Sequence, residues 1–181
     1  MRSPHKRAPL DAEGLWALAL KTLAAHACSA GELREKLRVR AGHAEDVESV
    51  LARLKDYRYL DDRRFAESFV AQRLENQRLG RSRVVRDLRG RRVAPALAEA
   101  TVKKAYQDVD EAALVEEYVR RKYRKTAAAE LFQDEKELAS AYRRLTRAGF
   151  STGHIIRVLK RFAANPELLD TFEPPASAEE E

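Results

Sequence analysis

The sequence predicts an all-α fold made of three tandem three-helix repeats. Residues 47–54 and 155–162 each place apolar side chains at i, i+3, i+4 and i+7, the spacing of one helix face. Each run follows a helix breaker, at residues 40–43 and 147–150 respectively. Self-similarity with a period of roughly 50 residues is typical of stacked helical units that cannot bury their apolar faces alone. Such an array presents a long surface and is poorly suited to enclosing a catalytic pocket.

The composition favours the same fold class. Ala, Leu, Arg and Glu dominate the 181 residues, Gly totals only 7, and 35% of the residues are charged. These residue types favour helix, and no alternating strand pattern of useful length is present. The apolar content of 44% is sufficient for a core and excludes a wholly disordered chain.

The compartment is indicated by cysteine usage and hydropathy. The single cysteine, Cys28, excludes an internal disulfide and is typical of a reducing compartment. No apolar run approaches the roughly 18 residues needed to span a bilayer. The basic N-terminus is not followed by the apolar segment of a signal peptide. We therefore expect a cytoplasmic protein.

The first repeat is expected at residues 11–59, after a flexible basic N-terminus at residues 1–10. Asp11 is placed to cap its first helix. Ser29 and Glu32 have the spacing of a capping box, in which the hydroxyl accepts from a first-turn N–H and the carboxylate reaches back. This pair predicts the start of the second helix.

The second repeat is expected at residues 60–108. Asp61 or Asp62 should cap its first helix, and Gly80 should break it. Pro95 fits the first position of the last helix, where its missing N–H is not needed.

The third repeat is expected at residues 109–164. Its first helix should begin at Asp110, and Ser151 should cap its last helix. Residues 165–181 are acidic and carry two adjacent prolines, a composition that predicts a disordered acidic tail.

The net charge of +6 is unevenly distributed. Residues 73–92 hold eight arginines and only two acidic residues, and residues 138–162 hold six basic residues and no acidic one. This distribution indicates a polyanionic partner or an acidic protein surface, although arginine-rich helix faces can also be merely solvated. Arginine suits such binding because its planar guanidinium pairs bidentately with carboxylate or phosphate. The candidate partner-binding residues are Arg73, Arg78, Arg81, Arg83, Arg86, Arg89, Arg91, Arg92, Arg143, Arg144 and Arg147.

Motifs that carry chemistry are not found in the sequence. It contains no GxxxxGK[ST], CxxC or HExxH pattern, so we expect no enzyme activity, cofactor or metal site. Asp61, Asp62 and Glu67 are the best candidates for a carboxylate metal site, but an Asp pair at a helix start more often serves as a cap. Tyr57 and Tyr59 could stack on bases or on a partner, yet two aromatics beside a helix junction more often wedge adjacent bundles together.

Three segments resemble the RecX family, the bacterial regulators of the RecA recombinase. Residues 59–73 read YLDDRRFAESFVAQR and are similar to the family's YLDD-x-RFA-x-x-FV-x-x-R signature. Residues 80–89 resemble its G-x-x-[RK]-[IVL]-x-x-[ED]-L block, and residues 147–151 resemble its RGFS element. The resemblance covers about residues 12–163.

The resemblance implies both a fold and a function. The fold is an extended, curved array of three tandem three-helix repeats. The function is negative regulation of homologous recombination through binding to the RecA filament on single-stranded DNA, which limits the filament's extension, ATP turnover and strand exchange. The resemblance implies no catalytic residue and no cofactor. We expect a monomer with no membrane partner, whose basic patches could also contact single- or double-stranded DNA.

Two positions depart from the family's pattern. Arg58 stands where the family usually has Gly before the Tyr of its signature, and Arg92 replaces the Gly of a Lys-Gly-Val run. We expect an altered turn into the second repeat at Arg58 and the loss of a glycine helix stop at Arg92.

Two other functions compete with the regulator hypothesis. The same arginines, together with helix–turn–helix-like pairs, are consistent with a direct, sequence-nonspecific DNA-binding module. A carboxylate-dependent nuclease would instead use Asp61, Asp62 and Glu67. Tight duplex binding without a recombinase would favour the first, and Mg²⁺-dependent cleavage would favour the second.

Overall fold

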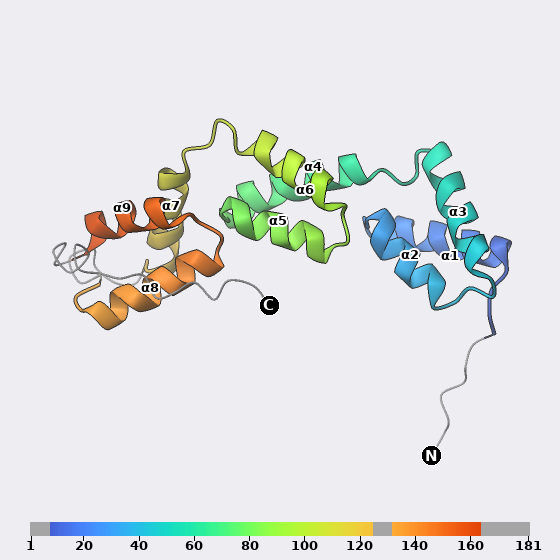
Figure 1. Ribbon diagram of the computed structural model, residues 1–181, viewed down its shortest axis with the longest axis horizontal. Coiled ribbons are helices and arrows are strands. Elements are labelled where there is room, and N and C mark those ends of the chain that lie inside the picture. The colour runs from blue at the N-terminus through green and yellow to red at the C-terminus, as the bar shows by residue number, and fades with distance from the viewer. Residues whose placement is uncertain (1–7, 125–131, 164–181) are drawn as a thin grey trace, which may run out of the picture. The chain divides into compact units, whose positions relative to one another are not determined.

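The computed structural model describes residues 8–124 and 132–163. Over these residues it contains helices and turns but no β-strand, only an isolated bridge between Leu10 and Ala41 (Figure 1). The predicted all-α class is therefore confirmed. The elements are α1 (Ala12–Ala25), α2 (Ala30–Arg38), α3 (Ala44–Asp56), α4 (Asp62–Gln72), the π-helical turn η1 (Arg73–Gln77), α5 (Arg81–Gly90), α6 (Pro95–Ala105), α7 (Glu111–Lys122), α8 (Glu135–Arg147) and α9 (Thr152–Phe162).

The helices follow one another as three sets of three, but the chain packs as two compact units. The N-terminal unit contains the described residues up to Phe69 together with Asp87–Thr101. The C-terminal unit contains Val70–Arg86 together with the described residues from Val102 onward. Helices α4, α5 and α6 thus contribute to both units. The exact limits of the three repeats stay predictions, and the acidic tail lies outside the described residues.

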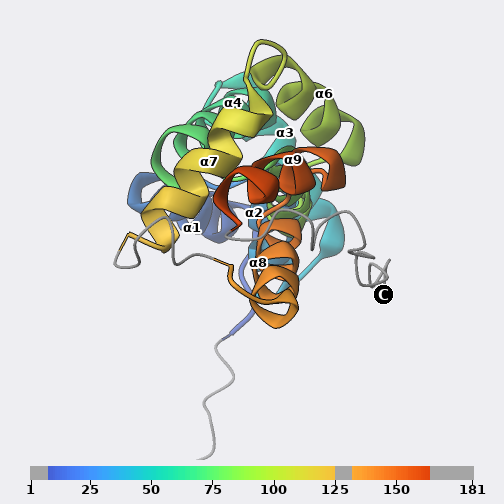
Figure 2. The same cartoon turned by 90° about the vertical axis from the view of Figure 1, so that its left-hand side faces the viewer.

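Each unit has a core formed by the residues that helical spacing predicted. In the N-terminal unit, Val47, Val50, Leu51 and Leu54 of α3 are all buried against α1 and α2. In the C-terminal unit, α9 lies beside α7 and against α8 (Figure 1 and Figure 2), with Ile155, Val158 and Leu159 of α9 buried there. The apolar stripes of these helices therefore face the cores of the two units.

Most helix caps lie where the sequence predicted them. Asp11 accepts from the Gly14 N–H (2.9 Å), and Asp110 accepts from the Ala112 N–H (2.9 Å). The capping box at the start of α2 is complete. Helix α6 begins at Pro95, as predicted, and proline has no N–H that would need an acceptor. The contacts of Asp11, Asp110 and Ser29 each satisfy an N–H that the helix itself leaves without an acceptor.

Ser151 caps differently from expectation, whereas the predicted cap by Asp61 is confirmed and Asp62 caps a second helix. Ser151 precedes α9, but its hydroxyl contacts His154 Nδ1 (2.7 Å) rather than a first-turn N–H. Asp61 caps its own helix by accepting from the Arg64 N–H (3.0 Å). Asp62 accepts from the Ala30 N–H (2.7 Å), at the start of α2. Its carboxylate therefore caps a helix that begins 32 residues earlier.

Helices α3, α5 and α8 end in the same left-handed turn. The second residue after each helix has a positive φ: 58° at Arg58, 57° at Arg92 and 91° at Gly149. In all three, the next N–H bonds back to a carbonyl five residues earlier, as in a Schellman motif. These bonds run from Tyr59 to Leu54 (2.9 Å), Val93 to Leu88 (3.1 Å) and Phe150 to Leu145 (3.3 Å). The expected changes at Arg58 and Arg92 were wrong, because both arginines adopt the turn that favours glycine.

The turn after α5 forms a junction inside the N-terminal unit. The Ser29 hydroxyl donates to the Arg91 carbonyl (2.5 Å). Gly31 lies so close to the Arg92 backbone that no Cβ could be accommodated. The Arg91 guanidinium forms an ion pair with Glu32 (2.5 Å), on the first turn of α2. The N-terminus of α2 is therefore docked on the turn that ends α5.

The turn after α8 forms the same junction inside the C-terminal unit. Gly80 N–H donates to the Ala148 carbonyl (2.9 Å), and Ser82 N–H donates to the Gly149 carbonyl (3.2 Å). A Cβ on Gly149 would overlap the Arg83 backbone, and a Cβ on Gly80 would overlap Gly149. In this junction backbone N–H groups at a helix start meet free carbonyls at a helix end, where the partial charges are opposite, whereas in the N-terminal junction the Ser29 hydroxyl is the donor.

Replacing Gly149 by Ala should loosen the junction in the C-terminal unit. The new Cβ would clash with backbone and the residue would keep a left-handed φ, so we expect the free energy of unfolding to fall by about 2–4 kcal/mol. Gly90→Ala is the matched control, because a Cβ there has open space and alanine is the better helix former. Urea unfolding compares the two, and equal stabilities would contradict the proposed packing.

Arg58→Gly should stabilise the protein. A non-glycine residue at positive φ costs about 1–2 kcal/mol, part of which glycine loses again through its greater freedom in the unfolded chain. We expect a gain of about 0.5–1 kcal/mol in thermal or urea unfolding. Arg58→Lys keeps both the charge and the strain, and it should show no gain.

Tyr106 should make the stability of the protein depend on alkaline pH. Its side chain is 2% exposed and its hydroxyl donates to the Leu79 carbonyl (2.6 Å). Burial, assisted by Glu111, raises the pKa of Tyr106 from 10.0 to about 12. The folded state therefore holds the phenol proton more tightly than the unfolded chain does. The resulting stability is complete below pH 10 and is lost as the pH rises through about 12.

We expect the free energy of unfolding to fall by about 2–3 kcal/mol across that interval. Tyr106→Phe removes the titrating group. Over the same pH range, the free energy of unfolding of this variant should therefore fall by about 2–3 kcal/mol less than that of the wild type. Parallel pH profiles for the wild type and the Phe variant would show that Tyr106 does not control the loss.

Candidate functional site

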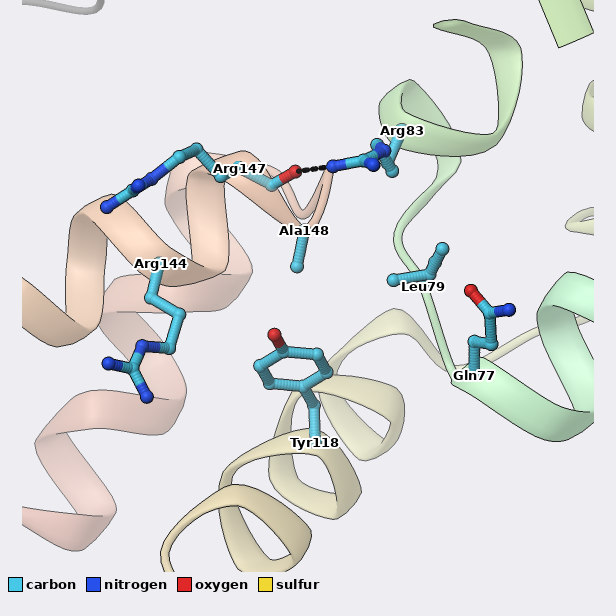
Figure 3. A pocket seen from close by; sticks show the side chains of 7 residues that line it. All are labelled: Gln77, Leu79, Arg83, Tyr118, Arg144, Arg147 and Ala148. Atoms are coloured by element: carbon cyan, nitrogen blue, oxygen red, sulfur yellow. Dashed lines mark hydrogen bonds between the residues drawn. The ribbon is translucent and has the colours of Figure 1, made fainter. Parts of the chain in front are cut away.

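A basic cleft opens in the C-terminal unit at the junction of α5 with α8 (Figure 3). Its volume is about 300 Å³, and none of its lining residues is acidic. The lining residues belong to η1, to the loop that follows η1, to helices α5, α7 and α8, and to the position directly after α8. The residues are Gln77, Leu79, Arg83, Tyr118, Arg144, Arg147 and Ala148.

The junction described above positions the first arginine of the cleft. Arg83 lies in the first turn of α5, whose start is bonded to the turn after α8. Its guanidinium donates to the Arg147 carbonyl (3.4 Å), the contact drawn in Figure 3. Arg147 Nε in turn donates to the Arg143 carbonyl (3.3 Å). The backbone contacts that join the helices therefore place Arg83 against the end of α8, the helix whose Arg144 and Arg147 also line the cleft.

Tyr118 provides an aromatic wall whose orientation is fixed from both sides. Its ring meets Phe150 edge-on, with centroids 5.7 Å apart and planes at 74°. The Arg121 guanidinium lies 5.7 Å from the centroid of the ring. In Figure 3 the hydroxyl of Tyr118 is directed into the cleft, where it can donate to an anion.

Arg121 is a site-supporting residue that the sequence did not identify. Its guanidinium donates to the Asn76 carbonyl (3.2 Å) and the Gln77 carbonyl (2.6 Å) at the end of η1. This contact ties α7 to η1 and fixes the backbone that carries Gln77. In the sequence Arg121 belongs to a basic run at a helix C-terminus, which is ordinarily a solvated feature.

Arg144 is held over an aromatic ring. Its guanidinium lies 5.7 Å from the centroid of Tyr123, a distance that allows a cation–π interaction. Burial raises the pKa of Tyr123, while the nearby Arg144 charge lowers it by a smaller amount. The ring therefore stays neutral at physiological pH and supports the arginine.

Several predicted partner-binding arginines form ion pairs within the protein. Arg91 and Arg92 contact α2 across the N-terminal junction, where Arg91 also lies 5.2 Å from the centroid of Phe65. Such pairs stabilise the fold and reduce the charge available to a partner. The pairs are Arg78 with Glu117 (3.0 Å), Arg89 with Glu99, Arg91 with Glu32 (2.5 Å) and Arg92 with Glu35 (3.8 Å).

The remaining predicted arginines are exposed or partly exposed. Arg81 and Arg86 lie on the solvent side of α5, and Arg143 is exposed on α8. Arg73 is partly exposed at the start of η1. The structure thus brings three of the eleven arginines into the basic cleft and distributes the others along the helices.

The carboxylate-site alternative loses its geometric basis. Asp61 and Asp62 accept hydrogen bonds from the N-termini of two different helices, α4 and α2. Over residues 8–124 and 132–163, no three His, Cys, Asp or Glu side chains gather closely enough to hold a metal ion. Among those same residues, none of the helices has the length and apolarity needed to cross a bilayer.

Known proteins share both the sequence and the fold. The family model "RecX, second three-helix domain" matches residues 61–102. Regulatory protein RecX of Trichlorobacter lovleyi is 30% identical over 147 residues, which cover 81% of this chain and 93% of that protein. Regulatory protein RecX of Treponema pallidum (strain Nichols) is 35% identical over 97 residues, which cover 54% of this chain but only 59% of that protein.

A solved structure supports the fold assignment. The crystal structure of RecX from Lactobacillus salivarius superposes with a TM-score of 0.67, covering 84% of this chain and 96% of that one, at 19% sequence identity. This similarity shows a shared fold, and the match to the Trichlorobacter protein extends over nearly all of that relative. The chain belongs to the RecX family of regulatory proteins.

Proposed function

We propose that this protein is a negative regulator of homologous recombination that binds the RecA–single-stranded DNA filament and limits its extension, ATP turnover and strand exchange. Membership in the RecX family supports a regulatory role. The observation that carries the proposal to particular residues is the basic cleft, which is lined by three arginines and by no acidic residue.

The cleft suits a carboxylate or phosphate group of the filament. Arg83, Arg144 and Arg147 offer guanidinium groups that can form charge-assisted, bidentate hydrogen bonds. Tyr118 and Gln77 add neutral donors at the same edge. Because the cleft is held by backbone contacts and an aromatic wall, little side-chain freedom is lost on binding.

The exposed arginines extend this binding surface along the helices. We propose that Arg73, Arg81, Arg86 and Arg143 make weaker, salt-sensitive contacts around the cleft. Arg78, Arg89, Arg91 and Arg92 belong to the proposed surface less directly, because each is already paired with a glutamate. Several modest contacts on one chain reinforce one another through their high effective concentration.

In this proposal the regulator inhibits by occupying a site on the filament, and it binds as a monomer without a cofactor. A bound chain would obstruct the growth of the filament and the subunit rearrangements that accompany ATP turnover. No covalent step is required of any residue in the cleft. Binding energy and the size of the bound protein are sufficient for such inhibition.

Neutralising the cleft should weaken inhibition. We expect R83Q/R144Q/R147Q to raise the concentration needed to halve RecA ATP turnover on single-stranded DNA at least tenfold, since each lost charge-assisted contact contributes about 1 kcal/mol or more. The control K36Q/K103Q/K104Q removes three charges from exposed positions outside the cleft. Circular dichroism checks that both variants are folded.

Two results would reject this assignment of residues. One is inhibition by the cleft variant at the wild-type concentration. The other is an equal loss in the control, which would indicate a nonspecific charge effect. Tight duplex binding by the wild type without RecA, with a steep dependence on salt, would instead support the direct DNA-binding alternative.

A further inference from the structure

An exposed aromatic cluster lies at the end of α3 in the N-terminal unit. Tyr57 and Tyr59 are 59% and 57% exposed, and both contact Trp16 of α1. The two tyrosine rings are 6.1 Å apart between centroids, with planes at 26°. We call Trp16, Tyr57 and Tyr59 the aromatic platform. The expectation that the tyrosines wedge neighbouring bundles together was wrong, because their rings pack on α1 and remain largely open to solvent.

The backbone holds the platform in place. Arg58, between the two tyrosines, adopts the left-handed turn that ends α3. Tyr57 N–H bonds to the Arg53 carbonyl (3.0 Å), and Tyr59 N–H bonds to the Leu54 carbonyl (2.9 Å). Leu60, which follows directly, is buried in the core. The rings are therefore fixed before any ligand binds, which lowers the entropic cost of binding.

The segment that carries the two tyrosines of the platform has a net positive charge. The Arg53 guanidinium lies 4.0 Å from the centroid of the Trp16 ring and also pairs with Glu13 (3.2 Å). Residues 53–64 contain five basic and three acidic side chains. Two of those acids, Asp61 and Asp62, accept hydrogen bonds from helix N-termini. Flat aromatic faces thus lie within a basic segment.

We propose that the aromatic platform binds unpaired bases of single-stranded nucleic acid. Bases of any sequence stack on aromatic side chains, while neighbouring cations contact the phosphates, and both components are present here. A protein-binding hot spot would instead be expected within a larger apolar surface. Apart from the two tyrosines, the exposed large apolar residue in the described part of the chain is Val39, which directly follows α2.

The chain's single tryptophan lies within the platform and reports on binding. Wild-type protein is titrated with a labelled oligodeoxythymidylate and with an abasic strand of the same length and charge. We expect the thymidylate to quench Trp16 fluorescence and to bind about tenfold more tightly than the abasic strand. Y57A/Y59A should bind both strands with the weaker affinity, measured by anisotropy of the labelled strand.

The control is Val39→Ala, which removes an exposed apolar side chain outside the platform and should retain the tenfold preference. The replaced tyrosines are mostly exposed, so the fold should persist, as an unchanged melting temperature would show. Equal affinity of the wild type for both strands would overturn the proposal. So would a preference that survives in Y57A/Y59A. If that variant keeps the preference but loses RecA inhibition, the platform contacts protein instead.

Discussion

The contact between a helix start and a left-handed turn organises this protein. A helix has free N–H groups at one end and free carbonyls at the other, and neither end can be buried unless it is paired. At the C-terminal junction the Gly80 N–H meets the Ala148 carbonyl, and at the N-terminal junction the Ser29 hydroxyl, at the start of α2, donates to the Arg91 carbonyl. Close approach requires small residues, which explains Gly31, Gly80 and Gly149. Apolar burial stabilises the helices, whereas this contact fixes which helix docks on which.

The basic cleft follows from that constraint. Arg83 and Arg147 are 64 residues apart, and they meet because the start of α5 is bonded to the turn after α8. Arg121 and Tyr118 then fix the remaining walls from α7. The aromatic platform depends on the corresponding turn after α3, which orients its two tyrosines. In each case a turn required for folding also determines the geometry of a surface.

Features governed by neighbours along the chain could be predicted from the sequence. The spacing in α3 and α9, the capping box at Ser29 and the cap at Asp11 each involve residues within a few positions of one another. Features governed by tertiary contacts could not be predicted from the sequence. Asp62 caps a distant helix, and Arg121 bonds to carbonyls about 45 residues earlier, which no local pattern encodes. Arg58 and Arg92 misled the prediction because surrounding hydrogen bonds override the preference of a single residue.

Helix α5 takes part in both junctions, one at each of its ends. Its first residues donate to the turn after α8, and the turn that follows it receives α2. Melting this one ten-residue helix would therefore remove support from neighbours on both sides. Tandem helical proteins can lose their repeats one at a time. Sharing one helix between two docking contacts opposes such fraying and favours collective, all-or-none loss of structure.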